Sequence, residues 1–496
     1  MHVLGRIRQL SPSSKATPLK FGIVSALAEG ADRLVAREVL HDPDAVLEVA
    51  LPLPRADYGQ DFATAQSREE FESLLDQARV IAMMPPSESR EAAYAAAGRY
   101  IVDRVDVLVA LWDGEPSRGV GGTGEIVAEA RDRRLPLFCI RPSADYEVYE
   151  QPREPFQRAD FHENDHYNRL RIGRQLPGYV AGASRDWLAA ARSAGLEDSA
   201  VRPSMDWILP FLARADIMSR RYQRSYHRLG SSLFLAAFLA VAVAAFQGTF
   251  VPNHPEIAFL EVALLLALLF WLLYGRQRKV QPRWIAYRAL AERLRVASFL
   301  SVAGFGGRWV KNADAHQPDH DAHDWLHRGH EEVWMEHPRD GLSPPHPSGA
   351  IQRFLASAWL GGQLEYYLRA SQRHLRRDRA LTRLVWAAFS LTLLAALLHG
   401  IGALRAIWGD AVLLAASCLP ALAAAFGGIR AEREYRRNAE RFTRLSRDLQ
   451  VLKNRMEHAA DDQTVRALAK ATEAVVLHEH YDWFSLMQFR DLELHV

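Results

Sequence analysis

Long apolar blocks occur in the chain from residue 229 onwards, whereas shorter apolar runs alternate with helical stretches before it. The four blocks are Leu229–Phe246, Ile257–Tyr274, Leu384–Leu404 and Ala411–Ile429. Each is about as long as the roughly 20 residues that a helix needs to cross a bilayer. The blocks form two close pairs, so we predict four transmembrane helices in two hairpins. The alternative, buried helices of a soluble protein, is disfavoured by the charges that flank the pairs.

Basic residues mark the outer ends of both pairs, and only Arg405 lies in a connection within a pair. The positive-inside rule therefore predicts a multi-pass inner-membrane protein with both termini and the central segment in the cytosol. No apolar run precedes Phe21, so we expect no cleavable signal peptide. The flanking basic residues are Arg220, Arg221, Arg224, Arg228, Arg276, Arg278, Lys279, Arg373, Arg376, Arg377, Arg379, Arg383, Arg430, Arg433, Arg436 and Arg437.

The overall composition narrows the class of protein further. The formal net charge is +2, which gives no general attraction to nucleic acid, and no nucleic-acid partner is expected. The two cysteines, Cys139 and Cys418, both lie in apolar runs. A disulfide framework is therefore not expected, and a reducing cytosol fits the chain.

A short internal repeat follows each pair of apolar blocks. Tyr287–Leu294 and Tyr435–Phe442 both read Tyr-Arg-x-x-Ala-Glu-Arg followed by an apolar residue. We interpret the repeated unit as a membrane hairpin that continues into a charged cytosolic helix. The alternative is a chance similarity between two helices rich in Arg and Ala.

The N-terminal part predicts an α/β fold. Strand-like runs at 21–24, 46–53, 80–84, 106–112 and 135–140 alternate with helical stretches. This order predicts a Rossmann-like parallel sheet covered on both faces. We expect loops and one helix near Ser184–Ala194 in the polar stretch 141–204, then a helix over 205–228 that leads into the membrane. We expect five parts. Residues 1–145 form a nucleotide-binding domain, and 146–204 form a loop-rich extension. Residues 205–300 and 351–496 form a first and a second membrane module, and 301–350 form a His-rich linker between them.

The strongest local signal for chemistry lies between the fourth strand-like run and the next helix. Residues 112–125 read Trp-Asp-Gly-Glu-Pro-Ser-Arg-Gly-Val-Gly-Gly-Thr-Gly-Glu. Glycines let the backbone approach a ligand, and a helix N-terminus offers free N–H groups to a phosphate. The alternative is a glycine-rich turn without a ligand. The candidate binding residues are Asp113, Gly114, Arg118, Gly119, Gly121, Gly122, Thr123 and Glu125.

A second loop of small residues follows the first strand, from Ser25 to Asp32. Asp32 either caps the next helix or binds ribose hydroxyls together with Glu29. Pro52 ends the second strand at the same edge of the sheet, where open α/β sheets bind their ligands. The candidate binding residues here are Ser25, Glu29, Gly30, Ala31, Asp32 and Pro52.

Several short motifs in combination resemble the SLOG superfamily, in the branch related to the nucleotide-sensing regions of TRPM-type channels. They are Ser-x-Leu-Ala-Glu-Gly-Ala-Asp, Leu-Pro-Leu-Pro-Arg, Ala-Gly-Arg-Tyr-Ile-Val, Trp-Asp-Gly and Arg-Gly-x-Gly-Gly-Thr-x-Glu, all within residues 17–142. The paired apolar helices with their repeat look like SLATT-type two-helix effector modules of bacterial conflict systems. SLOG members usually open with a strand ending in Gly-His-Arg. This chain lacks that motif and resembles the following helix from Met1, so we expect part of the pocket to be missing or rebuilt.

The resemblance implies a nucleotide-sensing membrane effector, either a ligand-gated ion channel or a membrane-disrupting protein of an antiphage response. It implies an ADP-ribose-like or cyclic nucleotide second messenger as the ligand, with no other cofactor. Spans made mainly of Leu, Ala, Val and Phe leave too little polar surface to line a pore in one chain, so we expect a homo-oligomer in the lipid bilayer. The alternatives are a membrane-tethered nucleotide hydrolase and a membrane scaffold.

Two further features bear on an enzyme or a metal site. In LOG-type phosphoribohydrolases, relatives of SLOG, a Gly-rich loop carries a catalytic carboxylate, and Glu125 is the matching acid here. No second catalytic partner is identifiable, so we favour binding and assign no catalytic residue. His323 and His327 have a spacing that suits zinc, but no cysteine joins them. We therefore expect a solvated loop and no metal at the cluster of His316, His320, His323, His327, His330, His337 and His346.

Overall fold

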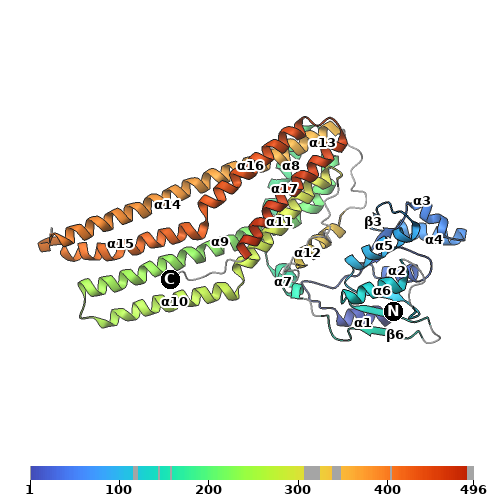
Figure 1. Ribbon diagram of the computed structural model, residues 1–496, viewed down its shortest axis with the longest axis horizontal. Coiled ribbons are helices and arrows are strands. Elements are labelled where there is room, and N and C mark those ends of the chain that lie inside the picture. Colours follow the sequence, from blue (N-terminus) through green and yellow to red (C-terminus); the bar gives the residue numbers. More distant parts are fainter. Residues whose placement is uncertain are drawn as a thin grey trace. The chain divides into compact units, whose positions relative to one another are not determined.

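The computed structural model describes residues 2–115, 121–142, 146–156, 159–305, 324–337, 348–402 and 405–488 (Figure 1). The chain divides into two compact units. An α/β unit comprises Met1–Arg171 and Asn312–Met335, and a helical unit comprises Ile172–Lys311 and Glu336–Val496. The predicted fold class, an α/β domain with parallel strands and a helical region with four apolar helices, is confirmed. The finer five-part division stays a prediction.

The α/β unit alternates strands with helices, as the hydrophobic pattern predicts. Its strands are β1 (Gly22–Ser25), β2 (Val46–Leu51), β3 (Val80–Met83), β4 (Leu108–Leu111), β5 (Leu137–Ile140) and β6 (Val148–Gln151). Its helices are α1 (His2–Leu10), α2 (Ala31–Leu40), α3 (Arg55–Tyr58), the short 3₁₀ helix η1 (Gly59–Asp61), α4 (Ala65–Leu75), α5 (Arg90–Arg104), α6 (Thr123–Asp132), α7 (Ala159–Arg169) and α12 (Asp324–Met335).

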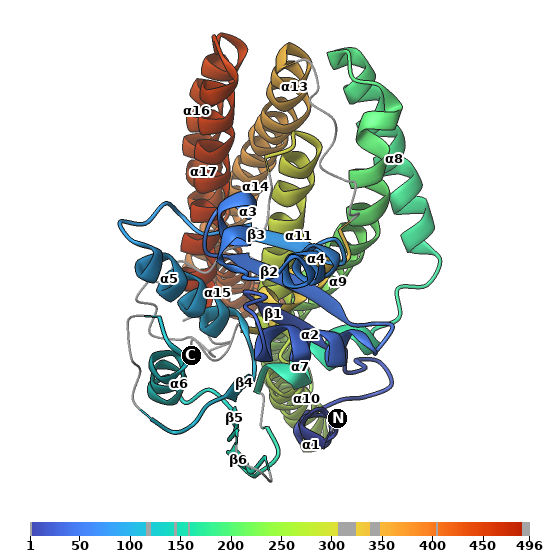
Figure 2. The ribbon, with the colours of Figure 1, turned by 90° about the vertical axis from the view of Figure 1, so that its right-hand side faces the viewer.

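Hydrogen bonds join the strands of this unit into two three-stranded sheets, whose ribbons are seen in Figure 2. The strands β1, β2 and β3 are parallel, with Val24 opposite Glu48 and Ala50 opposite Ala82. In the second sheet β4 pairs parallel with β5, and β6 pairs antiparallel with β5. The five predicted strands are present. The sequence analysis missed β6, because this short strand is largely exposed and polar.

Helices cover both faces of the first sheet, as continuous apolar strands require. Leu47, Val49 and Leu51 of β2 pack in one cluster with side chains of α2 and α4. On the opposite face, Ala50 and Met84 pack against α5. One charged residue, Glu48, is also buried in β2. It accepts hydrogen bonds from Tyr100 at 2.5 Å and pairs with Arg104 at 3.0 Å, so α5 supplies the partners that a buried carboxylate needs.

The helical unit contains long helices only, apart from two short segments. Its elements are α8 (Gln175–Ala194), α9 (Asp198–Phe250), the 3₁₀ helix η2 (Pro255–Ile257), α10 (Ala258–Gln277), α11 (Val280–Val302), α13 (Ser348–Phe354), the π-helix η3 (Leu355–Gly361), α14 (Gly362–Gly400), α15 (Arg405–Arg433), α16 (Tyr435–Glu457) and α17 (Asp462–Gln488). Four of these stretches are long and apolar enough to cross a membrane. They carry the four predicted apolar blocks in α9, α10, α14 and α15, so the protein is a multi-pass membrane protein.

The two hairpins follow the same plan, which supports the repeat. In each, the first helix (α9 or α14) runs unbroken from the charged region into the apolar block. The second helix ends at a single residue with left-handed backbone, Lys279 (φ 47°) or Glu434 (φ 45°), and a charged helix follows it. The repeated tyrosines then pack on the first helix of their own hairpin. The ring centroids of Tyr287 and Tyr222 are 5.2 Å apart, and those of Tyr435 and His374 are 5.6 Å apart.

The four apolar helices contact one another in the order α10, α9, α15 and α14, side by side in Figure 1. Trp271 of α10 donates a hydrogen bond to Ser232 of α9 at 2.7 Å. Between the hairpins, Arg433 of α15 donates to the His227 carbonyl oxygen of α9 at 2.8 Å. In the second hairpin, Arg430 of α15 pairs with Asp378 of α14 at 2.7 Å. Beyond the apolar blocks, α11 lies between α9 and α17 (Figure 2).

Two expectations about polar segments are wrong. The stretch 141–204 holds β6, α7 and the 20-residue helix α8 rather than loops with one short helix. Part of the His-rich linker is also ordered, since α12 packs through Trp325 on Tyr167 of α7. In both cases a polar stretch does not indicate a loop, because a helix with a single buried face has a largely polar sequence.

Candidate ligand-binding site

The loop between β1 and α2 folds around Asp32. The Ser25 hydroxyl donates to the Asp32 carboxylate at 3.1 Å, and the Ala28 N–H donates to the same oxygen at 3.3 Å. Burial raises the pKa of Asp32, and the hydrogen bonds from Ser25 and Ala28 oppose that rise. Gly30, with φ of 97°, ends the loop at the first turn of α2. Asp32 thus organises its own loop, and its carboxylate closes the loop on Ser25.

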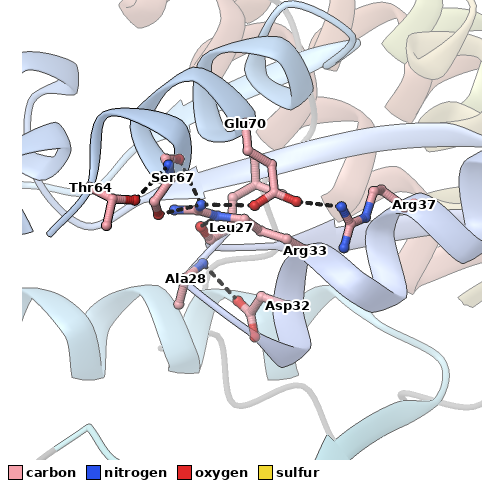
Figure 3. A network of polar contacts seen from close by, with 8 residues as sticks. All are labelled: Leu27, Ala28, Asp32, Arg33, Arg37, Thr64, Ser67 and Glu70. Carbon is pink, nitrogen blue, oxygen red and sulfur yellow. Dashed lines mark hydrogen bonds and ion pairs between the residues drawn. The ribbon is translucent and has the colours of Figure 1, made fainter. Parts of the chain in front are cut away.

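Arg33, which follows Asp32, has a fully buried side chain (Figure 3). Its Nε donates to the Leu27 carbonyl oxygen at 3.0 Å. Its Nη1 donates to the Ser67 carbonyl at 2.7 Å and to the Ser67 hydroxyl at 2.9 Å. The guanidinium also lies 4.2 Å from the centroid of the Phe62 ring. Arg33 therefore ties the β1–α2 loop, with Leu27 in a left-handed conformation (φ 56°), to the start of α4.

An aromatic cluster forms where β2 ends. Pro52 is buried, and the chain continues to Tyr58, which is 2% exposed. The Tyr58 ring lies 5.1 Å from Phe62 and 6.2 Å from Tyr94 of α5. Tyr58 shares a buried cluster with Leu27 of the β1–α2 loop. Burial and the nearby charge of Asp32 raise the pKa of Tyr58. Tyr58 thus connects the first two loops of the sheet edge with α5.

The glycine-rich loop between β4 and α6 is described on either side of residues 116–120, so Arg118 and Gly119 lie outside the described residues. Before the gap, Asp113 accepts a hydrogen bond from the Glu115 N–H at 3.0 Å. Gly114 has φ of 93°, and the side chain nearest to it belongs to Arg141. The contacts described for Asp113 and Gly114 are therefore local to β4 and β5.

After the gap, Gly121 and Glu125 close the turn into α6. The Gly121 N–H donates to Glu125 Oε2 at 2.7 Å. This bond has the form of a helix cap, in which an acid in the first turn reaches back to the preceding backbone. Gly122 caps α6 without a side chain, and in the described part of the chain no acceptor is present for the N–H groups of Thr123 and Gly124. Such a helix start suits an anion.

The start of α5 connects these loops. A Cβ at Gly121 would lie 2.7 Å from the Ala95 nitrogen, so the third loop rests directly on the α5 backbone. Tyr94, the neighbouring residue, contacts Tyr58, and its hydroxyl donates to Asp61. Through α5, the Gly121–Glu125 turn is linked to the segment after Pro52, and the Ser25–Asp32 loop adjoins the same segment through Arg33 and Phe62. Glu29 and Gly30 of that loop are exposed, and Ala31 is half-buried.

The sequence analysis missed Arg33 and Tyr94. A signal for Arg33 was present, because it shares the buried face of α2 with Ala36 and Val39 at helical spacing. Tyr94 had no such signal, since its contacts come from a loop far away in sequence. The described residues contain no group of three or more metal-ligating side chains, although His323 and three other members of the histidine cluster lie outside them.

These observations define a multi-pass membrane protein that carries an α/β unit with a polar, glycine-rich sheet edge. Residues 359–483 match the family model described as SMODS and SLOG-associating 2TM effector domain 1. The match covers the second hairpin with its charged helices and less than half of the chain. This part is therefore similar to a two-helix membrane effector, as the resemblance to SLATT-type modules predicted. The SLOG-like interpretation of residues 17–142 stays a prediction. No curated protein matches the chain, and no solved structure matches it.

Proposed function

We propose that this protein is a nucleotide-sensing membrane effector of a bacterial antiphage or related conflict response. One observation supports the proposal most: an α/β unit with a glycine-rich helix start that lacks a side-chain cap shares its chain with a region similar to a two-transmembrane effector domain. A sensor needs a ligand site and an output in one molecule. Here the first unit offers the site, and the second offers the membrane helices.

In this proposal, the start of α6 binds a phosphate of the ligand. Free N–H groups after Gly122 and the positive end of the helix dipole favour an anion there. Ser25 and Asp32 then receive the ribose, and an ADP-ribose-like or cyclic nucleotide contains both groups. Arg118 and Gly119 complete the loop by sequence position. The proposed ligand is a nucleotide second messenger, and no other cofactor is proposed.

The proposed output is ion flux or loss of membrane integrity through a homo-oligomer. The apolar windows of the four helices are at most 17% buried within one chain, so most of their surface is available to lipid or to other copies. Closed symmetry lets each copy contribute one narrow face to a shared pathway. We propose the bacterial inner membrane as the location, with both termini in the cytoplasm.

Gly122→Asp tests the ligand site. The new carboxylate is expected to cap the N–H groups of α6, because Gly122 already has N-cap geometry (φ −75°, ψ 161°). We therefore expect the variant to fold at least as stably as the wild type and to lose nucleotide binding. Isothermal titration of the purified full-length protein with ADP-ribose and cyclic dinucleotides measures the loss, and thermal unfolding measures stability.

The matched control is Thr64→Asp. Thr64 caps α4 and already accepts a hydrogen bond from the Ser67 N–H at 3.1 Å, so this variant adds the same charge at another helix start. Nucleotide affinity should stay at the wild-type level. If Gly122→Asp binds nucleotide as tightly as the wild type, the site assignment is wrong.

Glu125→Gln separates the sensor from a tethered hydrolase. The glutamine side chain retains an oxygen that can accept the Gly121 N–H, so the turn should persist. We expect unchanged nucleotide affinity and an unchanged membrane effect in liposome flux assays. Nucleotide cleavage by the wild type that disappears in the variant would favour the enzyme instead.

A further inference from the structure

The first helix of the second hairpin, α14, carries an unusual set of arginines where it meets its apolar block. The set is Arg373, Arg376, Arg377, Arg379 and Arg383, and Leu384 begins the apolar block directly after it. One acid, Asp378, lies among them. Asp378 is 9% exposed and pairs with Arg430 of α15, so its charge is already compensated.

None of these five arginines forms an ion pair within the described part of the chain. Some basic residues at other helix ends of the unit differ from them. Arg220 of α9 pairs with Asp216 at 2.8 Å, and Arg436 and Arg437 of α16 pair with Glu440 and Glu434. Arg221, Arg224 and Arg228 of α9 are also exposed and without carboxylate partners among the described residues, but they form a smaller group. Among the described residues, no carboxylate therefore pairs with this basic surface beside the third span.

Helix geometry sorts the side chains of α14 onto two faces. Arg376, Arg379, Arg383 and Trp386 follow one another at spacings of three, four and three residues, so they form one stripe along the helix. Asp378 lies two positions from Arg376 and hence on the other side, where it meets α15. The three arginines are exposed, and Trp386 is 64% exposed. We call this set the outward stripe.

The outward stripe has the chemistry of a phospholipid headgroup site. Guanidinium groups bind phosphate oxygens with two hydrogen bonds, and a tryptophan one turn into an apolar block sits at headgroup level. The three arginines span about 10 Å along the helix, a distance that the headgroup layer covers. We propose that the outward stripe of α14 binds the phosphate headgroups of anionic phospholipids. The site lies outside the α/β unit and is independent of any nucleotide.

The test uses the detergent-solubilised full-length protein and native mass spectrometry with phosphatidylglycerol or phosphatidylcholine. The wild type should retain phosphatidylglycerol in preference to phosphatidylcholine. Arg376→Gln, Arg379→Gln and Arg383→Gln together should lower the affinity for phosphatidylglycerol about a hundredfold, since each basic residue near an anionic lipid surface contributes appreciably. Trp386→Ala should weaken retention of the lipid while keeping the preference for the anionic headgroup.

The matched control is the triple variant Arg436→Gln, Arg444→Gln and Arg447→Gln on α16, which removes the same charge from exposed positions farther from the apolar block. It should retain phosphatidylglycerol like the wild type. The proposal is overturned if the α14 triple variant retains the lipid unchanged, or if the α16 variant loses it equally. It is also overturned if millimolar inorganic phosphate displaces the lipid, because the site would then recognise free phosphate.

Discussion

Replacing Arg33 with alanine should destabilise the α/β unit by about 3–5 kcal/mol, the usual cost of breaking a buried, hydrogen-bonded charged contact. The variant leaves the carbonyl oxygens of Leu27 and Ser67 without their donor and removes the group that stacks on Phe62. This side chain and Asp32 together hold the β1–α2 loop. Hydrogen exchange of the full-length protein at β1 and β2 measures the loss of local stability.

Arg37→Ala is the control for this variant. Arg33 also pairs with Glu70 at 3.3 Å. Arg37 lies one turn later on α2 and pairs with Glu70 at 2.5 Å, but its side chain is 54% exposed. An exposed ion pair contributes about 1 kcal/mol or less, so exchange at β1 and β2 should hardly change. Equal effects of the two variants would show that burial of Arg33 does not matter to the loop.

Gly121→Ala should displace the turn before α6 and abolish nucleotide binding. Gly121 has φ of 82°, where an L side chain costs about 1–2 kcal/mol. The new Cβ would also meet the Ala95 backbone nitrogen at 2.7 Å, and backbone cannot move aside as a flexible side chain can. Such overpacking adds about 1–3 kcal/mol. Urea unfolding and nucleotide titration of the full-length protein measure both effects.

Gly114→Ala is the control that separates the conformational cost of a positive φ from the cost of the steric contact. Gly114 has φ of 93°, but the nearest atom to a new Cβ there is 3.8 Å away in the Arg141 side chain. The variant should therefore incur only the conformational cost and keep most of its stability. If Gly114→Ala and Gly121→Ala lose the same stability, the contact between the β4–α6 loop and α5 is unimportant.

The sequence predicts those helices and strands whose hydrophobic pattern reflects burial of one whole face or of the entire surface of the element. The strands β1 to β5 are apolar runs, and the four spans are longer ones, so both are visible without a structure. β6, α7 and α12 are not visible in this way, because each buries only a few residues. Trp325 of α12 packs on Tyr167, more than a hundred residues away, and no local pattern reports such a contact.

The candidate site was predictable to the level of loops and not of side-chain roles. Glycines and small residues after strands indicate the sheet edge, because parallel strands end on the same side. The sequence does not reveal that Glu125 is engaged by the Gly121 N–H or that Asp32 closes its loop on Ser25. Those roles depend on bond geometry over a few ångströms, which spacing along a chain does not determine.

The helix α9 has 53 residues and is therefore about 80 Å long, so one continuous helix joins the charged region to the apolar block. The helix α14 does the same over its 39 residues. In α10 and α15, by contrast, one left-handed residue separates the apolar block from the charged helix that follows. A displacement of the charged region should therefore reach the membrane more directly through α9 and α14 than through α10 and α15.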